Sequence, residues 1–131
     1  MRALAATLIF LTGLLHVLPV SGVLSTERLH ALYGVAIADP DLAIFMRHRA
    51  VLFGIVAGLL IAAAFRPPLR NVAIAVGLVS MLSFVVIAVS LGGYNAELRR
   101  VVAVDALGSL LLVAAAGIER FARRGSGWDG P

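Results

Sequence analysis

The sequence predicts an all-α fold: an integral membrane four-helix bundle with a short interfacial helix between helices 1 and 2. Hydrophobic residues make up 61% of the chain and charged residues 14%, whereas soluble domains contain about 45–50% apolar and about 25% charged residues. The apolar residues form four long runs, at residues 3–15, 50–65, 72–91 and 101–118. About 20 apolar residues cross a bilayer as a helix. We therefore expect one transmembrane domain over residues 1–124, with spans at about 2–20, 43–65, 70–91 and 99–119.

The first run has two interpretations. Met1-Arg2 supplies a basic start and Val20-Ser21-Gly22 loosely resembles a cleavage site, as in a signal peptide. Against this, the apolar stretch continues to Pro19, which is long enough to span a bilayer. We therefore expect a retained membrane helix.

Between the first two spans the chain leaves the apolar core. Ser25 is a predicted N-cap and Gly34 a predicted C-terminal stop, which together define a short amphipathic helix. This helix is expected to lie on the membrane surface or to fold back over the bundle. Asp39 as N-cap and Pro40 at the first helical position then begin the second long helix.

The remaining helix limits follow from breakers and caps. Arg66-Pro67-Pro68 ends the second helix and allows a tight turn into the third. Gly92-Gly93 ends the third helix, and Asn95 is placed to cap the fourth. Residues 125–131 are expected to be a disordered tail.

The charges indicate lipid partners and exclude several classes of site. All eleven basic residues are arginine, and the net charge is +4. Because they lie at span ends, we expect them to contact lipid headgroups and not nucleic acid. Six lie on the side of the termini and five on the other side, which favours cytoplasmic termini. The chain has no cysteine, so disulfides and thiolate metal sites are excluded, and no metal site is expected.

Antiparallel threading brings the polar residues of the spans toward one membrane face. The predicted ligand-binding candidates are His16, Arg47, His48, Arg49, Ser90, Arg100 and Asp105. An unpartnered carboxylate in a membrane helix costs about 2.5–3.5 kcal/mol, so Asp105 needs a partner. It is either an ion-pair partner of Arg47, Arg49 or Arg100 that fixes helix register, or a carboxylate that accepts a proton or orients a ligand.

The basic residues have similar alternatives. Arginine binds phosphate and carboxylate groups in a bidentate manner, so Arg47, His48 and Arg49 suit a headgroup or a quinone-like carbonyl. The simpler interpretation is contact with bulk lipid phosphates. His16 and His48 suggest axial haem ligation, or else ordinary hydrogen-bonded histidines.

Small residues predict helix packing, and no motif predicts catalysis. Gly54 and Gly58 form a GxxxG pattern, and Gly108 follows Asp105 on a small, polar face. Both patterns permit close helix approach. The sequence contains no phosphate-binding glycine loop, paired-histidine zinc motif or nucleophile elbow, so whether the protein is an enzyme stays open.

Three stretches of the chain carry a family resemblance: residues 32–34 with Asp39-Pro40, residues 46–54, and residues 92–95 with 99–101. They resemble small DoxX-like bacterial membrane proteins, which are compact four-helix bundles of about this length. The resemblance implies a bacterial inner (cell) membrane location. Some relatives of those proteins are tied to quinone or thiosulfate redox chemistry.

Three functions are consistent with these patterns. The first is a binding protein that holds an amphipathic ligand, a lipid or a quinone-like molecule, in the polar layer near one membrane face. The second is a haem-carrying redox subunit with histidine ligation. The third is a structural or assembly subunit that forms a homo-oligomer or joins a membrane complex.

Overall fold

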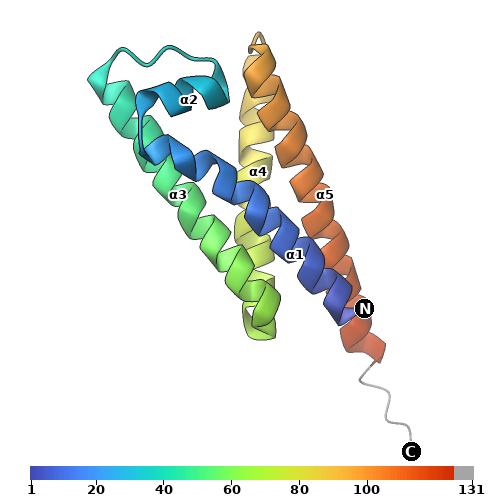
Figure 1. Cartoon of the computed structure of the whole chain (residues 1–131). Coiled ribbons are helices and arrows are strands. Elements are labelled where there is room, and N and C mark those ends of the chain that lie inside the picture. Colours follow the sequence, from blue (N-terminus) through green and yellow to red (C-terminus); the bar gives the residue numbers. More distant parts are fainter. Residues whose placement is uncertain (126–131) are drawn as a thin grey trace, which may run out of the picture.

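A computed structural model describes residues 1–125, and the expected tail lies outside the described residues from residue 126 on. The chain is all-α, as predicted, and four long helices pack as a bundle (Figure 1). These are α1 (Arg2–Val17), α3 (Pro40–Phe65), α4 (Arg70–Leu91) and α5 (Ala96–Gly125). The short helix α2 (Thr26–Tyr33) and two 3-10 turns, η1 (Leu18–Val23) and η2 (Pro67–Leu69), connect them.

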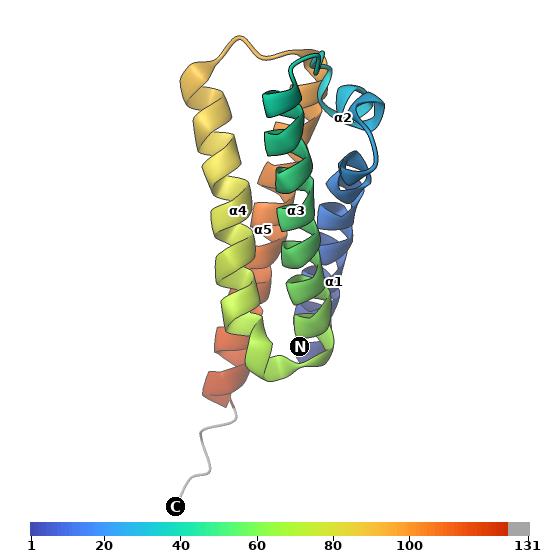
Figure 2. The same ribbon diagram turned by 90° about the vertical axis from the view of Figure 1, so that its left-hand side faces the viewer.

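The long helices have the length and composition of membrane spans. Four segments qualify: Arg2–Val23, Pro40–Phe65, Pro67–Leu91 and Ala96–Arg124. Large apolar side chains point away from the bundle, among them Leu91 at 81% and Phe65 at 75% exposure. Lipid satisfies such a surface and water does not, so the protein is a small multi-pass membrane protein. The N-terminus and the last turns of α5 lie at the same end of the bundle (Figure 2), as four spans require.

The first span is extended by a tighter turn. α1 ends at Val17 and the chain continues as η1 through Pro19 to Val23. Proline interrupts α-helical hydrogen bonding, and 3-10 geometry lets the chain continue in the same direction. The span therefore reaches Val23, a little beyond the expected limit near residue 20.

The short helix α2 folds back over the bundle, which was one of the two expected positions. Ser25 caps it by accepting a hydrogen bond from the Arg28 amide at 3.3 Å, and Gly34 ends it in the left-handed conformation at φ 65°. Leu29 and Tyr33 are buried beneath it. Asn95, at the start of α5, donates to the Tyr33 carbonyl at 2.9 Å and so links the end of α2 to the start of α5.

The predicted breaks elsewhere in the chain are confirmed. The Asp39 carboxylate accepts from the Asp41 amide at 2.8 Å, and Pro40 is the first residue of α3. The helix ends at Phe65, before Pro67. The Asn95 side chain accepts from the Leu98 amide at 2.8 Å at the start of α5.

Glycines bring the helices close at positions that the GxxxG pattern does not include. A Cβ atom on Gly13 of α1 would lie 3.2 Å from the Ile61 backbone nitrogen of α3. A Cβ atom on Gly108 would lie 2.6 Å from the Met81 sulfur of α4. By contrast, Gly58 is exposed and nothing lies within 4 Å of its Cβ position, while Gly54 has only Val20 at 3.6 Å. The close α1–α3 approach at Gly13 is therefore independent of the Gly54–Gly58 stripe.

Candidate functional site

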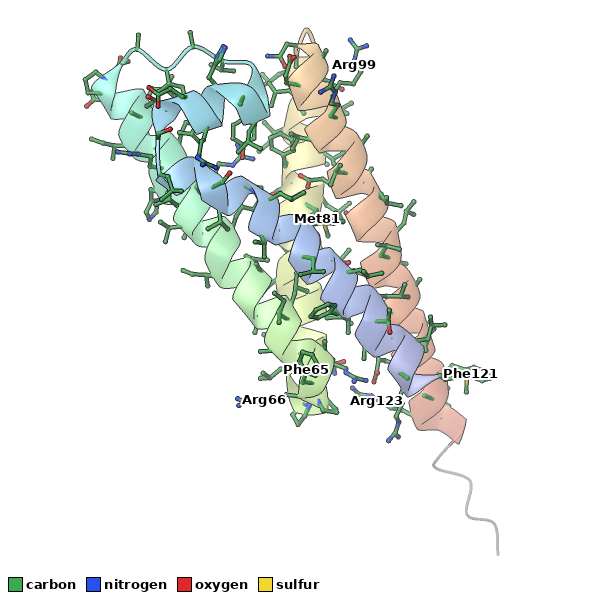
Figure 3. All side chains as sticks on the ribbon, in the orientation of Figure 1. Phe65, Arg66, Met81, Arg99, Phe121 and Arg123 are labelled. Atoms are coloured by element: carbon green, nitrogen blue, oxygen red, sulfur yellow. The ribbon has the colours of Figure 1, made fainter. Side chains whose placement is uncertain are left out.

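Buried polar side chains gather at two levels of the bundle. One level lies near the N-terminus and the last turns of α5, where the labelled Arg66 and Arg123 are found, and the other lies toward α2 and Arg99 (Figure 3). Met81 lies between these ends and contributes to the apolar core. The two levels differ in how completely their polar atoms are paired.

The level near the termini is built around Arg70 and Glu119. Arg70 is 5% exposed and forms an ion pair with Glu119 of α5. Its other donors reach backbone carbonyl oxygens: Nε donates to Ala63 at 3.2 Å, Nη2 to Ala64 at 3.1 Å and Nη1 to Arg2 at 3.3 Å. Removing one partner from a buried ion pair of this kind strongly destabilises the fold. This cluster links α1, α3, α4 and α5.

The level toward α2 contains His16 of α1 and Asp105 of α5. They are 3% and 9% exposed, and both line a cavity of about 20 Å³ together with Phe53 and Met81. The His16 Nδ1 atom lies 3.0 Å from the Thr12 carbonyl oxygen. Within residues 1–125, the His16 Nε2 and Asp105 Oδ2 atoms are buried without a hydrogen-bond partner. Such atoms are uncommon in folded proteins, and a bound water or ion is one explanation for them.

Arg49 of α3 is held at this level by aromatic rings. Its Cζ atom lies 4.7 Å from the ring centre of Phe84, 5.1 Å from that of Phe53 and 5.5 Å from that of Tyr33. These rings come from α4, α3 and α2, and each offers a cation–π contact. None of the hydrogen bonds or ion pairs among the described residues uses the Arg49 guanidinium, whose side chain is half-buried.

Two grooves open beside these residues. The first has a volume of about 390 Å³, lies between α3 and α4, and is lined by Arg49, Leu52, Phe53, Val56, Ser80, Ser83, Phe84 and Ile87. The second has a volume of about 260 Å³ and lies between α1, η1, α2 and α5. Its polar lining residues are Tyr33, Glu97, Arg100 and Asp105.

The electrostatics at Tyr33 show that Arg49 and Asp105 act on the same region. Burial raises the pKa of the Tyr33 hydroxyl above its usual value. The positive charge of Arg49 lowers this pKa and the negative charge of Asp105 raises it. The neutral phenol is therefore the stable form of Tyr33 between the two charges.

The structure brings some of the predicted site residues together and separates others. His16 and Asp105 share the small cavity, and Asp105 and Arg100 share the groove beside α2. Arg49 instead lines the groove between α3 and α4. His16 and Asp105 therefore line one cavity, and Arg49 lines another. The other candidates are exposed: Arg47, which donates to the Leu24 carbonyl at 2.8 Å, His48, and Ser90, which donates to the Ile87 carbonyl at 2.8 Å.

A haem or metal is a poor fit to these histidines. His16 faces a cavity of about 20 Å³, which accommodates about one water molecule. His48 is exposed and lines none of the cavities described above. Among the residues that the structure describes, no group of three or more His, Asp or Glu side chains is arranged to hold a metal ion.

Sequence reasoning missed Arg70 and Glu119 as partners, and it missed the aromatic contacts of Arg49. One signal was available, because Glu119 is an acidic residue within a predominantly apolar helix and needs a partner there. Arg70 lies just after the Pro67-Pro68 turn and was assigned to the lipid headgroups, although it is buried. The rings around Arg49 come from three helices, so local spacing gave no indication of them.

Four long apolar helices thus define a small four-span membrane protein. Comparisons of the chain with protein-family models, with curated proteins and with solved structures found no match.

Proposed function

We propose that this membrane protein binds an amphipathic ligand, a lipid or a quinone-like molecule, in the groove between α3 and α4. Arg49 holds the polar head of the ligand. The observation that carries the proposal is the state of its guanidinium, which contacts three aromatic rings and makes no hydrogen bond to any residue in the range 1–125.

The absence of a hydrogen bond at Arg49 within the described residues matters because of where this residue lies along α3. It lies nine residues after Pro40, roughly 14 Å along α3 at 1.5 Å per residue. A charged group inside a membrane helix is costly and is commonly found where it serves a pathway or a ligand. The rings of Tyr33, Phe53 and Phe84 offset part of this cost, and they leave the N–H donors available to a ligand.

The lining of the groove matches the apolar tail of an amphipathic molecule. Leu52, Val56 and Ile87 line it with aliphatic side chains, which suit an acyl or isoprenoid tail. The planar guanidinium donates in pairs to phosphate and carboxylate oxygens, and a quinone carbonyl also accepts from it. A polar head beside Arg49 with an apolar tail along the groove satisfies both surfaces.

The resemblance to DoxX-like proteins supports a quinone as one ligand class. We place the protein, on that resemblance, in the bacterial inner membrane, and its arginines favour cytoplasmic termini. The cysteine-free sequence allows a direct test of orientation. Gly93→Cys and Ala3→Cys place single thiols at opposite ends of the bundle. A membrane-impermeant thiol reagent added to intact cells is expected to label Gly93→Cys and not Ala3→Cys, and the reverse pattern contradicts the orientation.

Ligand content tests the binding function. The parent protein and the Arg49→Gln variant are extracted with native lipids, and bound molecules are identified by native mass spectrometry. Charge-assisted hydrogen bonds contribute about 1.5–3 kcal/mol each, so we expect the bound ligand to fall about tenfold or more in Arg49→Gln. Arg47→Gln is the matched control, because Arg47 is an exposed neighbour whose guanidinium donates to the Leu24 carbonyl and lines none of the cavities described above. Equal ligand content in all three proteins contradicts the proposal.

Assembly through α3 is a second candidate function. Gly58 is exposed and has open space at its Cβ position, so a larger side chain fits the monomer and interferes only with a neighbouring helix. Gly58→Leu is therefore expected to dissociate an oligomer or complex that uses this face. Gly117→Leu on α5 is the control, since Gly117 is also exposed with open space around it. An assembly that survives Gly58→Leu excludes this use of the face.

A further inference from the structure

The small cavity between α1 and α5 contains two buried atoms with matching requirements. The His16 Nε2 atom and the Asp105 Oδ2 atom both belong to side chains that line it. In the part of the chain that the structure describes, both atoms lack a hydrogen-bond partner. Their side chains are 3% and 9% exposed, so bulk water does not reach them freely.

The hydrogen bond at the Nδ1 atom of the imidazole determines whether Nε2 acts as a donor or as an acceptor. The Thr12 carbonyl oxygen, 3.0 Å from Nδ1, is only an acceptor, so Nδ1 carries the proton and donates it. In the neutral ring, Nε2 is then an acceptor. An ionised Asp105 also offers only acceptors. Both atoms therefore require a donor, and neither supplies one to the other.

The volume of the cavity, about 20 Å³, selects the donor. A cavity needs a volume of roughly 10–15 Å³ to hold one water molecule, and a buried water usually makes about three hydrogen bonds. We propose that this cavity binds a single water molecule that donates to His16 Nε2 and Asp105 Oδ2, and that these three groups form a proton-binding site reached from the groove beside α2.

Asp105 provides the route, because it also lines the groove that contains Tyr33, Glu97 and Arg100. A proton from the groove binds the Asp105 carboxylate, and the resulting carboxyl group donates it to the water. The water passes one of its own protons to His16 Nε2. Overall, one proton moves from the groove to the imidazole, the water is regenerated and Asp105 returns to the carboxylate.

The groups that face this site come from all the neighbouring helices. α2 contributes the Tyr33 hydroxyl and α3 the Arg49 guanidinium, and the charges of Arg49 and Asp105 both act on Tyr33. α4 contributes Met81, which does not titrate. Asp105 is the acidic residue that lines the cavity with His16, so it is the group placed to neutralise an imidazolium there, and the Arg49 guanidinium competes for the same carboxylate. The site does not depend on the identity of the ligand between α3 and α4.

Nuclear magnetic resonance of the full chain in nanodiscs tests the proposal. The chain has three histidines, and the exposed His30 and His48 are replaced by glutamine so that His16 alone gives imidazole signals. At about pH 8 we expect the Nδ1–H tautomer and a cross-peak between the ring and a slowly exchanging water. The Nε2–H tautomer, or a ring with no such water contact, overturns the bound water without any further variant.

The Asp105→Asn variant in the same background tests the proton site. On acidification from about pH 8 to pH 5, across the range in which histidine ordinarily titrates, His16 in the parent is expected to form an imidazolium. In Asp105→Asn the imidazolium fraction at the same pH is expected to fall severalfold, because its counter-charge is lost. Equal fractions in the two proteins, or no imidazolium in the parent, overturn the proton site.

Discussion

The two buried polar levels of this bundle are built from similar residue types but are completed in different ways. Near the termini, the Arg70 guanidinium has Glu119 and three backbone carbonyls as partners. Near α2, the Arg49 guanidinium contacts aromatic rings and acts electrostatically on Asp105, but it makes no hydrogen bond or ion pair within residues 1–125. His16 and Asp105 each retain a buried atom without a partner among the same residues.

This difference in hydrogen-bond pairing indicates different roles for the two levels. A buried polar network that is fully satisfied within the protein fixes the packing of the elements that contribute to it. A network that leaves buried donors and acceptors unpaired destabilises the fold unless a ligand, water or proton completes it. We therefore assign the Arg70 level to holding the bundle together and the Arg49 level to binding.

The largest expected effect is on the satisfied level. Glu119→Leu leaves the Arg70 guanidinium buried without its counter-charge, and breaking a buried pair in this way costs about 3–5 kcal/mol. We expect a loss of this size in the free energy of unfolding, measured by denaturant titration in mixed micelles. Arg120→Gln is the control, because Arg120 is exposed and its replacement is expected to change stability by less than about 0.5 kcal/mol.

A double variant sharpens this result. Arg70→Met combined with Glu119→Leu removes both charges at once, and apolar replacements of a buried ion pair are often neutral or stabilising. The double variant is therefore expected to be more stable than Glu119→Leu alone. If the two are equally unstable, the pair is not the source of the loss.

Helix packing gives the next effect and is independent of both polar levels. Gly13→Val introduces a side chain whose Cβ atom would lie 3.2 Å from the Ile61 backbone nitrogen. Overpacking of this kind costs about 1–3 kcal/mol. Gly117→Val is the matched control, because the Gly117 Cβ position is open. Equal stability of the two variants, measured by thermal unfolding, contradicts the close α1–α3 approach.

Arg49 is expected to matter less for stability than for binding. Arg49→Leu removes its cation–π contacts, which contribute about 0.5–1 kcal/mol at exposed sites and about 2 when desolvated. Because the residue is half-buried, we expect a loss of about 1–2 kcal/mol in ligand-free protein by denaturant titration. A loss as large as that of Glu119→Leu indicates that Arg49 has a structural role instead.

The smallest effect is expected at Asp105. Asp105→Leu removes a carboxylate whose buried Oδ2 atom has no partner among the described residues, so the variant loses only the hydrogen bond to the proposed water, and a hydrogen bond contributes about 0.5–1.5 kcal/mol net. The variant is therefore expected to lie within about 1.5 kcal/mol of the parent. A loss comparable with that of Glu119→Leu removes the distinction between the two levels.

The sequence predicted the parts of this fold that depend on neighbouring residues. The caps formed by Ser25 and Asn95 join atoms three residues apart, so their residue types are sufficient evidence. The Arg70–Glu119 pair joins residues 49 positions apart, and helix rotation decides whether they meet. In the predicted site, the depth of His16 and Asp105 along their helices indicated that the two residues lie at the same level, and both line one cavity. Rotation, which the sequence did not specify, leaves His48 exposed.

A high-resolution experimental structure of the protein in its native lipids tests the central claim most directly. We expect an elongated ligand in the groove between α3 and α4, with a polar group about 2.7–3.2 Å from the Arg49 guanidinium. The contradicting result is a groove without a ligand in which the guanidinium is hydrogen-bonded to a protein acceptor such as Asp105. The level near α2 is then a second structural cluster like that of Arg70 and Glu119.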